Sequence, residues 1–133
     1  LFQTNSDNED WSTGTGKIPS RDLNWEKQFT VLQPSLRGTA VADYLDWLGV
    51  KTYRTRLMLC KPRVCYTIHT DYSPRLHLPL VTNNNCYFVF PEHEKVIHIP
   101  QTGETFWVDT RISHTFMNGS MENRLHLVMI VDD

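Results

Sequence analysis

Three residues with metal-binding side chains stand out in this sequence: His69 and Asp71, separated only by Thr70, and His114 further along the chain. Two imidazoles and one carboxylate form the ligand set that holds iron(II) on one face and leaves other positions open for substrate and O₂. Arg124, ten residues after His114, offers a fixed cation for the distal carboxylate of a dicarboxylate cosubstrate. Together these residues predict a non-haem iron oxygenase.

The His-x-Asp triplet is weak by itself. Six histidines and fifteen acidic residues among 133 make about one His-x-Asp/Glu triplet expected by chance. The prediction therefore depends on the elements that position these side chains.

Short apolar runs separated by turn-forming residues fill the chain from residue 52 onward. They predict strands at 53–60, 64–69, 76–81, 86–90, 95–98, 105–108, 114–118 and 125–131. Strands of this length without intervening helices are typical of a sandwich or barrel. We therefore expect an all-β core, with enough strands for a double-stranded β-helix of the jelly-roll or cupin kind.

This architecture brings the three residues to one place. Residues i and i+2 of a strand point to the same face of a sheet, so His69 and Asp71 can both face the mouth of a barrel. His114 opens a strand 45 residues after His69, which is far enough for the chain to return on the opposing sheet.

One short helix is expected before the strands. Thr39 is a suitable N-cap, apolar residues follow at helical spacing, and Gly49 is placed to end the helix. We expect this helix to pack on the sheet. The whole chain, 1–133, is interpreted as a single oxygenase domain, with a loose polar arm (1–20), a helical cover (21–50) and a jelly-roll core (51–133).

Composition limits the possible partners. The apolar content of 40% and the charged content of 21% are those of an ordinary soluble globular protein. A net charge of −2 argues against phosphate neutralisation on nucleic acid, and no run is long enough to span a membrane. Three cysteines without CxxC spacing argue against a disulfide framework or zinc site and favour a reducing cytoplasm. The chain starts at Leu1, which leaves open whether N-terminal sequence is missing.

Further residues accompany the metal-binding set in a fixed order: His69, then Arg75 to Leu78 with the sequence Arg-Leu-His-Leu, Gly103 through Trp107 to Asp109, His114 with Asn118, and Arg124. From about Arg54 to Asp132, this order resembles the aspartyl/asparaginyl β-hydroxylase family of 2-oxoglutarate-dependent oxygenases.

The resemblance implies a role for each matching position. His69 and His114 correspond to the metal-binding histidines, and the 2-oxoglutarate carboxylates are expected to contact Arg75, His77 and Arg124. The well-known family members have glycine at the position of Asp71 and bind iron through two histidines only. The carboxylate found here predicts a three-residue facial triad and weakens any transfer of their protein substrate.

The other histidines and two aromatic residues are not assigned to the metal or to the cosubstrate. Phe106 and Trp107 are expected in the core, and His93 and His98 are expected to be structural or exposed. His126 alternates with Leu125 and Leu127, so it can line the interior pocket.

We therefore expect Fe(II) bound by His69, Asp71 and His114, with 2-oxoglutarate and O₂ as cosubstrates. The reaction would be hydroxylation of an unactivated C–H bond in an amino acid or peptidyl side chain, Asp- or Asn-like by resemblance, with decarboxylation of 2-oxoglutarate to succinate. The expected partner is a small-molecule or peptide substrate, without nucleic acid or membrane. Two alternatives remain: a cupin-type metal enzyme that does not use 2-oxoglutarate, and a non-enzymatic β-sandwich binding module. Substrate identity and oligomeric state stay open.

Overall fold

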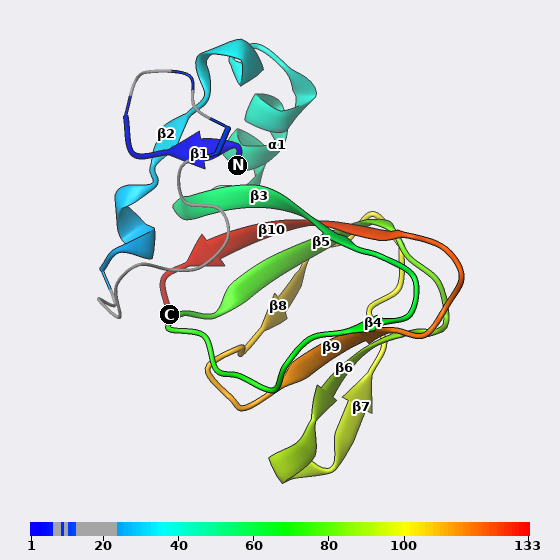
Figure 1. Cartoon of the computed structure of the whole chain (residues 1–133). Coiled ribbons are helices and arrows are strands. Elements are labelled where there is room, and N and C mark those ends of the chain that lie inside the picture. The colour runs from blue at the N-terminus through cyan, green and yellow to red at the C-terminus, as the bar shows by residue number, and fades with distance from the viewer. Residues whose placement is uncertain (7–8, 10, 13–23) are drawn as a thin grey trace. The chain divides into compact units, whose positions relative to one another are not determined.

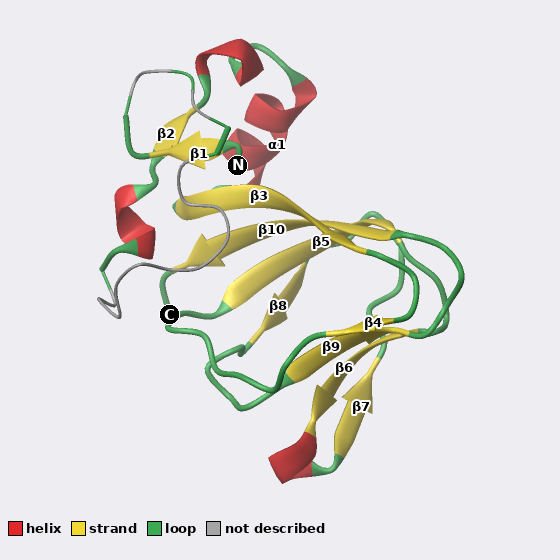
Figure 2. Cartoon of the chain, in the orientation of Figure 1, coloured by secondary structure: helices red, strands yellow, loops and turns green. Residues whose placement is uncertain are grey.

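The computed structural model describes residues 1–6, 9, 11–12 and 24–133. The chain divides into two compact units, one formed by residues 1–56 and 129–133 and the other by residues 57–128. Every residue of the predicted site lies in the second unit. Figures 1 and 2 show the elements in chain order and by type.

Two four-stranded sheets dominate the structure, in the orders β3-β10-β5-β8 and β4-β9-β6-β7. The strands are β3 (Thr52–Cys60), β4 (Val64–Cys65), β5 (Arg75–Val81), β6 (Cys86–Phe90), β7 (Lys95–Ile97), β8 (Phe106–Val108), β9 (Thr115–Asn118) and β10 (Arg124–Val131). The pairs β4–β9, β5–β8, β6–β7 and β6–β9 are antiparallel. All eight predicted strands are present, and the all-β prediction is confirmed.

The predicted strand 64–69 differs in length, because β4 ends at Cys65. Beyond it, the hydroxyl of Thr115 donates to the carbonyl of Tyr66 at 2.6 Å. A side-chain hydrogen bond of this kind competes with the backbone ladder. The pairing then resumes at one isolated bridge between His69 and His114.

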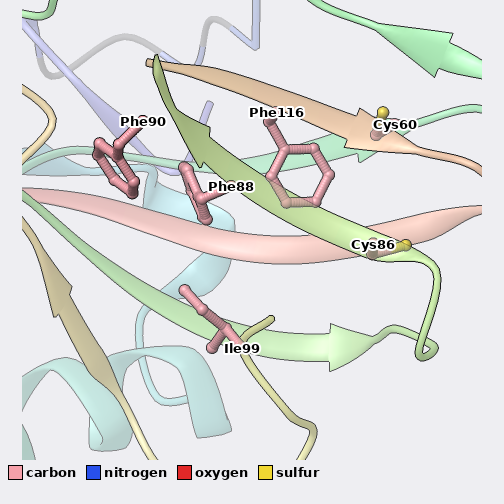
Figure 3. Packing of buried hydrophobic residues seen from close by; sticks show 6 residues of the cluster. All are labelled: Cys60, Cys86, Phe88, Phe90, Ile99 and Phe116. Atoms are coloured by element: carbon pink, nitrogen blue, oxygen red, sulfur yellow. The ribbon is translucent and has the colours of Figure 1, made fainter. Parts of the chain in front are cut away.

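Alternating burial along the strands of the second unit produces its core. In β6 the residues alternate between buried and half-buried, as expected for a strand with one face inward. Figure 3 shows the buried cluster of this core, which consists of Cys60, Cys86, Phe88, Phe90, Ile99 and Phe116. This apolar interior is the setting in which the polar site residues lie.

The unit formed by residues 1–56 and 129–133 contains α1 (Ala40–Leu48), β1 (Gln3–Thr4), β2 (Val31–Leu32) and two 3₁₀ turns, Glu26–Gln28 and Pro34–Leu36; a third 3₁₀ turn, Pro91–His93, belongs to the other unit. Gly49 ends α1 with φ +65°, a left-handed conformation that favours glycine. Thr39 is the N-cap residue, although its hydroxyl donates back to the carbonyl of Leu36. The packing of α1 on the sheet stays a prediction.

The predicted loose arm, 1–20, lies largely outside the described residues. At its start, however, Gln3 and Thr4 are buried and pair with β2. The Gln3 side chain donates to the carbonyl of Thr52 and accepts from the backbone N–H of Thr55, each at 3.1 Å. These bonds satisfy backbone groups of β3 and the amide of Gln3, which explains why this polar side chain can be buried. None of the described helices is long and apolar enough to cross a membrane.

Candidate functional site

His69 and His114 face each other across the end of the β4–β9 pair. The backbone N–H of each donates to the carbonyl of the other at 2.9 Å, which is the arrangement of a hydrogen-bonded antiparallel pair. Their ring centroids are 4.6 Å apart. The backbone therefore fixes the two imidazoles side by side.

Local hydrogen bonds also set which ring nitrogen is available. Nδ1 of His69 lies 2.8 Å from the carbonyl oxygen of Thr67, and Nδ1 of His114 lies 2.8 Å from that of Ile112. A carbonyl oxygen only accepts, so in the neutral form of each ring the proton is on Nδ1 and the lone pair is on Nε2. Metal-binding histidines usually donate their other ring N–H to an oxygen acceptor in this way.

The carboxylate of Asp71 completes the set. Its Oδ1 is 3.9 Å from Nε2 of His69, and its Oδ2 is 3.9 Å from Nε2 of His114. One donor atom from each residue lies within 4.8 Å of the others. The His69 side chain is 42% exposed and that of His114 only 4%, so the cluster is open on one side. Two nitrogens and one oxygen in this arrangement fit a divalent iron ion.

Burial favours the neutral form of His114. Desolvation lowers its pKa, against opposing contributions from the Ile112 hydrogen bond and from the Asp71 charge. Because a metal ligand must be deprotonated, the environment prepares this ring to bind metal near neutral pH.

Arg75 contacts Asp71 directly. Its Nε lies 2.7 Å from Oδ2 of Asp71, and both side chains are largely shielded from solvent. The resemblance implied a contact between Arg75 and the cosubstrate. That contact stays a prediction; the structure shows an ion pair between Arg75 and the carboxylate of Asp71.

Arg124 is a buried cation, 2% exposed, at the start of β10. Its guanidinium lies 3.6 Å from the ring centroid of Phe116, and Nη1 donates to the carbonyl of Met58 at 3.3 Å. Within the described part of the chain, its Nε has no hydrogen-bond partner and no carboxylate pairs with it. Burial lowers the pKa of Arg124 to about 10. A buried guanidinium with an unused donor is suited to receive an anion.

His77 and His126 form a second buried imidazole pair. Their Nδ1 atoms are 3.4 Å apart, and both Nε2 atoms lack a hydrogen-bond partner among the described residues. Burial lowers the pKa of His77 well below its usual range and that of His126 to about 3. Both rings are therefore neutral, and the unsatisfied nitrogens add hydrogen-bonding capacity to the interior near Arg124. His126 is buried, and its predicted place in the lining of a pocket stays a prediction.

The remaining candidates divide as follows. His93 is exposed, and half-buried His98 is bound through Nδ1 to the carbonyl of Cys86 at 2.9 Å, as expected for structural or exposed histidines.

The core prediction for Trp107 is wrong, because this side chain is 53% exposed. In β8, alternation turns Phe106 toward the core cluster and Trp107 away from it.

Comparison with known proteins supports both fold and family. A cupin domain from Bordetella pertussis Tohama I has a similar structure, with a TM-score of 0.50 and 14% sequence identity over 63% of this chain and 82% of that one. This likeness concerns the fold alone. No curated protein sequence matches the chain. The profile of the aspartyl/asparaginyl β-hydroxylases matches residues 41–133, a range that includes every residue of the predicted site. The chain therefore belongs to the aspartyl/asparaginyl β-hydroxylase family.

Proposed function

We propose that this hydroxylase-family protein is an Fe(II)- and 2-oxoglutarate-dependent dioxygenase. The observation that carries the proposal is the presentation of two Nε2 lone pairs, from His69 and His114, toward the Asp71 carboxylate. Iron(II) bound there, with 2-oxoglutarate and O₂ as cosubstrates, supplies the hydroxylation of an unactivated C–H bond, coupled to decarboxylation of 2-oxoglutarate to succinate. An amino acid or peptidyl side chain is the proposed substrate, and an Asp- or Asn-like one is implied by resemblance only.

Each residue has a distinct part in this proposal. His69, Asp71 and His114 hold the metal, and Arg75 holds the Asp71 carboxylate in place through its ion pair. Arg124 pairs with the distal carboxylate of 2-oxoglutarate, because a guanidinium fork matches a planar anion and this one has an unused Nε. His77 offers a neutral ring nitrogen beside it. Interactions of this kind orient the cosubstrate without a covalent step.

The surroundings of the metal site are apolar on the side of His114. The rings of Phe88 and Phe90 lie 6.0 and 5.9 Å from the His114 ring, centroid to centroid. They make the surroundings of His114 apolar, whereas the side chain of His69 is exposed to solvent.

We also propose a cytoplasmic location. Cys60, Cys65 and Cys86 are all free thiols, and unpaired thiols persist in reducing compartments. Cell fractionation checks this directly, because recovery of the native protein in a membrane or secreted fraction would contradict it.

The decisive experiment is an anaerobic titration of iron(II)-loaded protein with 2-oxoglutarate, followed through the weak visible charge-transfer band of the chelate. The variants are His114→Ala, Arg124→Ala and a control, His98→Gln, which alters a histidine outside the triad. We expect the band in the native protein and the control, no band in His114→Ala, and a much higher 2-oxoglutarate requirement in Arg124→Ala.

The other outcomes identify the alternatives. No band despite bound iron would favour a cupin-type metal enzyme that does not use 2-oxoglutarate. A protein that stays free of iron when iron(II) is supplied anaerobically would be better described as a binding module.

A further inference from the structure

An apolar pocket of about 390 Å³ lies between β8 and the β6–β7 pair. Its volume falls within the range of about 300–1,000 Å³ that is usual for small-molecule sites. The walls are mainly hydrophobic and include Phe88, Phe90, Ile97, Ile99, Phe106 and Val108. Figure 3 shows Phe88, Phe90 and Ile99 within the core cluster.

This pocket adjoins the candidate metal centre. Phe88 and Phe90, which line it, are the two rings beside His114. Ile112 also lines it, and its carbonyl accepts the hydrogen bond from Nδ1 of His114. A molecule in the pocket is therefore separated from the His114 ligand by no more than one layer of side chains.

Few charged groups line the pocket, and one of them is already neutralised. Asp109 is paired with Arg111 through contacts of 2.7 and 2.9 Å. Lys95 is exposed and has no ion-pair partner in the described part of the chain. The pocket thus combines hydrophobic walls with one available cation, which suits a carboxylate attached to an apolar group.

An aspartate or asparagine side chain fits this lining poorly. A carboxylate or amide that enters an apolar pocket without hydrogen-bond partners loses its hydration and gains little in return. A hydrophobic side chain releases water from both itself and the walls.

We propose that this pocket binds the substrate, and that the substrate is a free hydrophobic amino acid, with its side chain between Ile97 and Val108 and its carboxylate near Lys95. This inference rests on the proposed function for the reaction itself. It replaces the Asp- or Asn-like side chain implied by resemblance with an aliphatic or aromatic one.

Binding to the metal-free protein tests the pocket without any contribution from iron or 2-oxoglutarate. Saturation-transfer NMR would compare L-leucine and L-phenylalanine with L-aspartate and L-asparagine. The key variant is Ile97→Trp, which fills the pocket from an exposed strand position. The matched control is Val96→Trp, at the preceding residue of β7, which is also exposed but does not line the pocket.

We expect the hydrophobic amino acids to bind to the native protein and to Val96→Trp, and their affinity to fall more than about tenfold in Ile97→Trp, since even one methylene in a hydrophobic pocket changes affinity by about that factor. Lys95→Gln should weaken L-phenylalanine more than its amide. In the iron(II)-loaded protein, the same amino acids should raise succinate formation from 2-oxoglutarate.

The inference is overturned if the acidic amino acid or its amide binds better, if neither hydrophobic amino acid binds at millimolar concentration, or if Ile97→Trp behaves as Val96→Trp does. Its failure can be told from that of the proposed function. If the chelate band appears together with any of these results, the dioxygenase proposal stands and the hydrophobic-substrate proposal fails. If amino acid binding depends on Ile97 but no chelate band appears, the pocket proposal stands and the dioxygenase proposal fails.

Discussion

Replacing Arg124 by methionine separates a cosubstrate-binding role from a structural one. Methionine retains much of the length and packing volume of the side chain but removes its charge. If Arg124 is buried in order to bind an anion, the ligand-free protein should tolerate this change. If the charge mainly supports the fold, stability should fall.

The magnitude follows from the surroundings of the guanidinium. Burial lowers the pKa of Arg124 from 12.5 to about 10, and at about 1.4 kcal/mol per pH unit the buried charge costs roughly 3 kcal/mol. Stacking on the Phe116 ring offsets about 2 kcal/mol in a desolvated site. The hydrogen bond to the Met58 carbonyl offsets about 1.5 kcal/mol more. These contributions nearly cancel, so Arg124→Met should change the ligand-free unfolding free energy by less than about 1 kcal/mol.

The response to 2-oxoglutarate should change far more. A ligand at a hundred times its Kd stabilises the native protein by about 2.7 kcal/mol. Loss of one partner of a buried charge pair costs about 2–5 kcal/mol of binding, so Arg124→Met should lose nearly all of this stabilisation. Urea unfolding of the manganese(II)-loaded protein, with and without 2-oxoglutarate, measures both quantities.

A matched control is Arg63→Met, at an exposed arginine in the β3–β4 connection; it should retain the full response to 2-oxoglutarate. The reasoning is refuted if Arg124→Met loses more than about 2 kcal/mol without ligand and still gains the native stabilisation from 2-oxoglutarate.

Three further predictions concern other contacts. Arg75→Gln removes the ion pair that orients Asp71, so manganese(II) affinity in a metal titration should fall about 10–100-fold; unchanged affinity would exclude the positioning role. Burial lowers the pKa of His126 from 6.5 to about 3. Between these two pH values the unfolded state binds a proton at this residue and the folded state does not. The stability that is present above pH 6.5 is therefore lost as the pH falls toward 3. Urea unfolding at several pH values should therefore show a decline that is shallower in His126→Phe by up to about 1.4 kcal/mol per pH unit, and parallel curves would contradict this. Glu26→Gln removes the buried negative charge that pairs with the guanidinium of Arg54, which should cost about 3–5 kcal/mol in the same assay. A loss below about 1 kcal/mol would mean that water or another group compensates the charge.

The local features of this protein are readable from the sequence because they depend on spacing along the chain. Short apolar runs bounded by turn-forming residues mark the eight strands, as in Cys86–Phe90, which follows the asparagines at 83–85. Gly49 marks the end of α1 because its left-handed conformation favours glycine. The spacing of His69 and Asp71 indicates one shared face, since alternate residues of an extended chain point the same way.

Contacts between distant parts of the chain required the tertiary structure. Strand spacing does not reveal that His69 pairs with His114 through two backbone hydrogen bonds, because pairing partners are selected by the packing of the whole sheet. Gln3 is polar and near the chain start, yet it is buried because partners at Thr52 and Thr55 satisfy its amide.

For the functional residues too, the sequence indicates side-chain types, but their contacts require the tertiary structure. The types and order of His69, Asp71, His114 and Arg124 indicated their chemistry, because few side chains bind iron or hold a carboxylate in a buried site. Only the folded chain decided that Arg75 pairs with Asp71 across the turn between them, and that Trp107 faces away from the core. A sequence pattern specifies which face a side chain occupies within its own element, whereas the neighbouring elements decide what that face contacts.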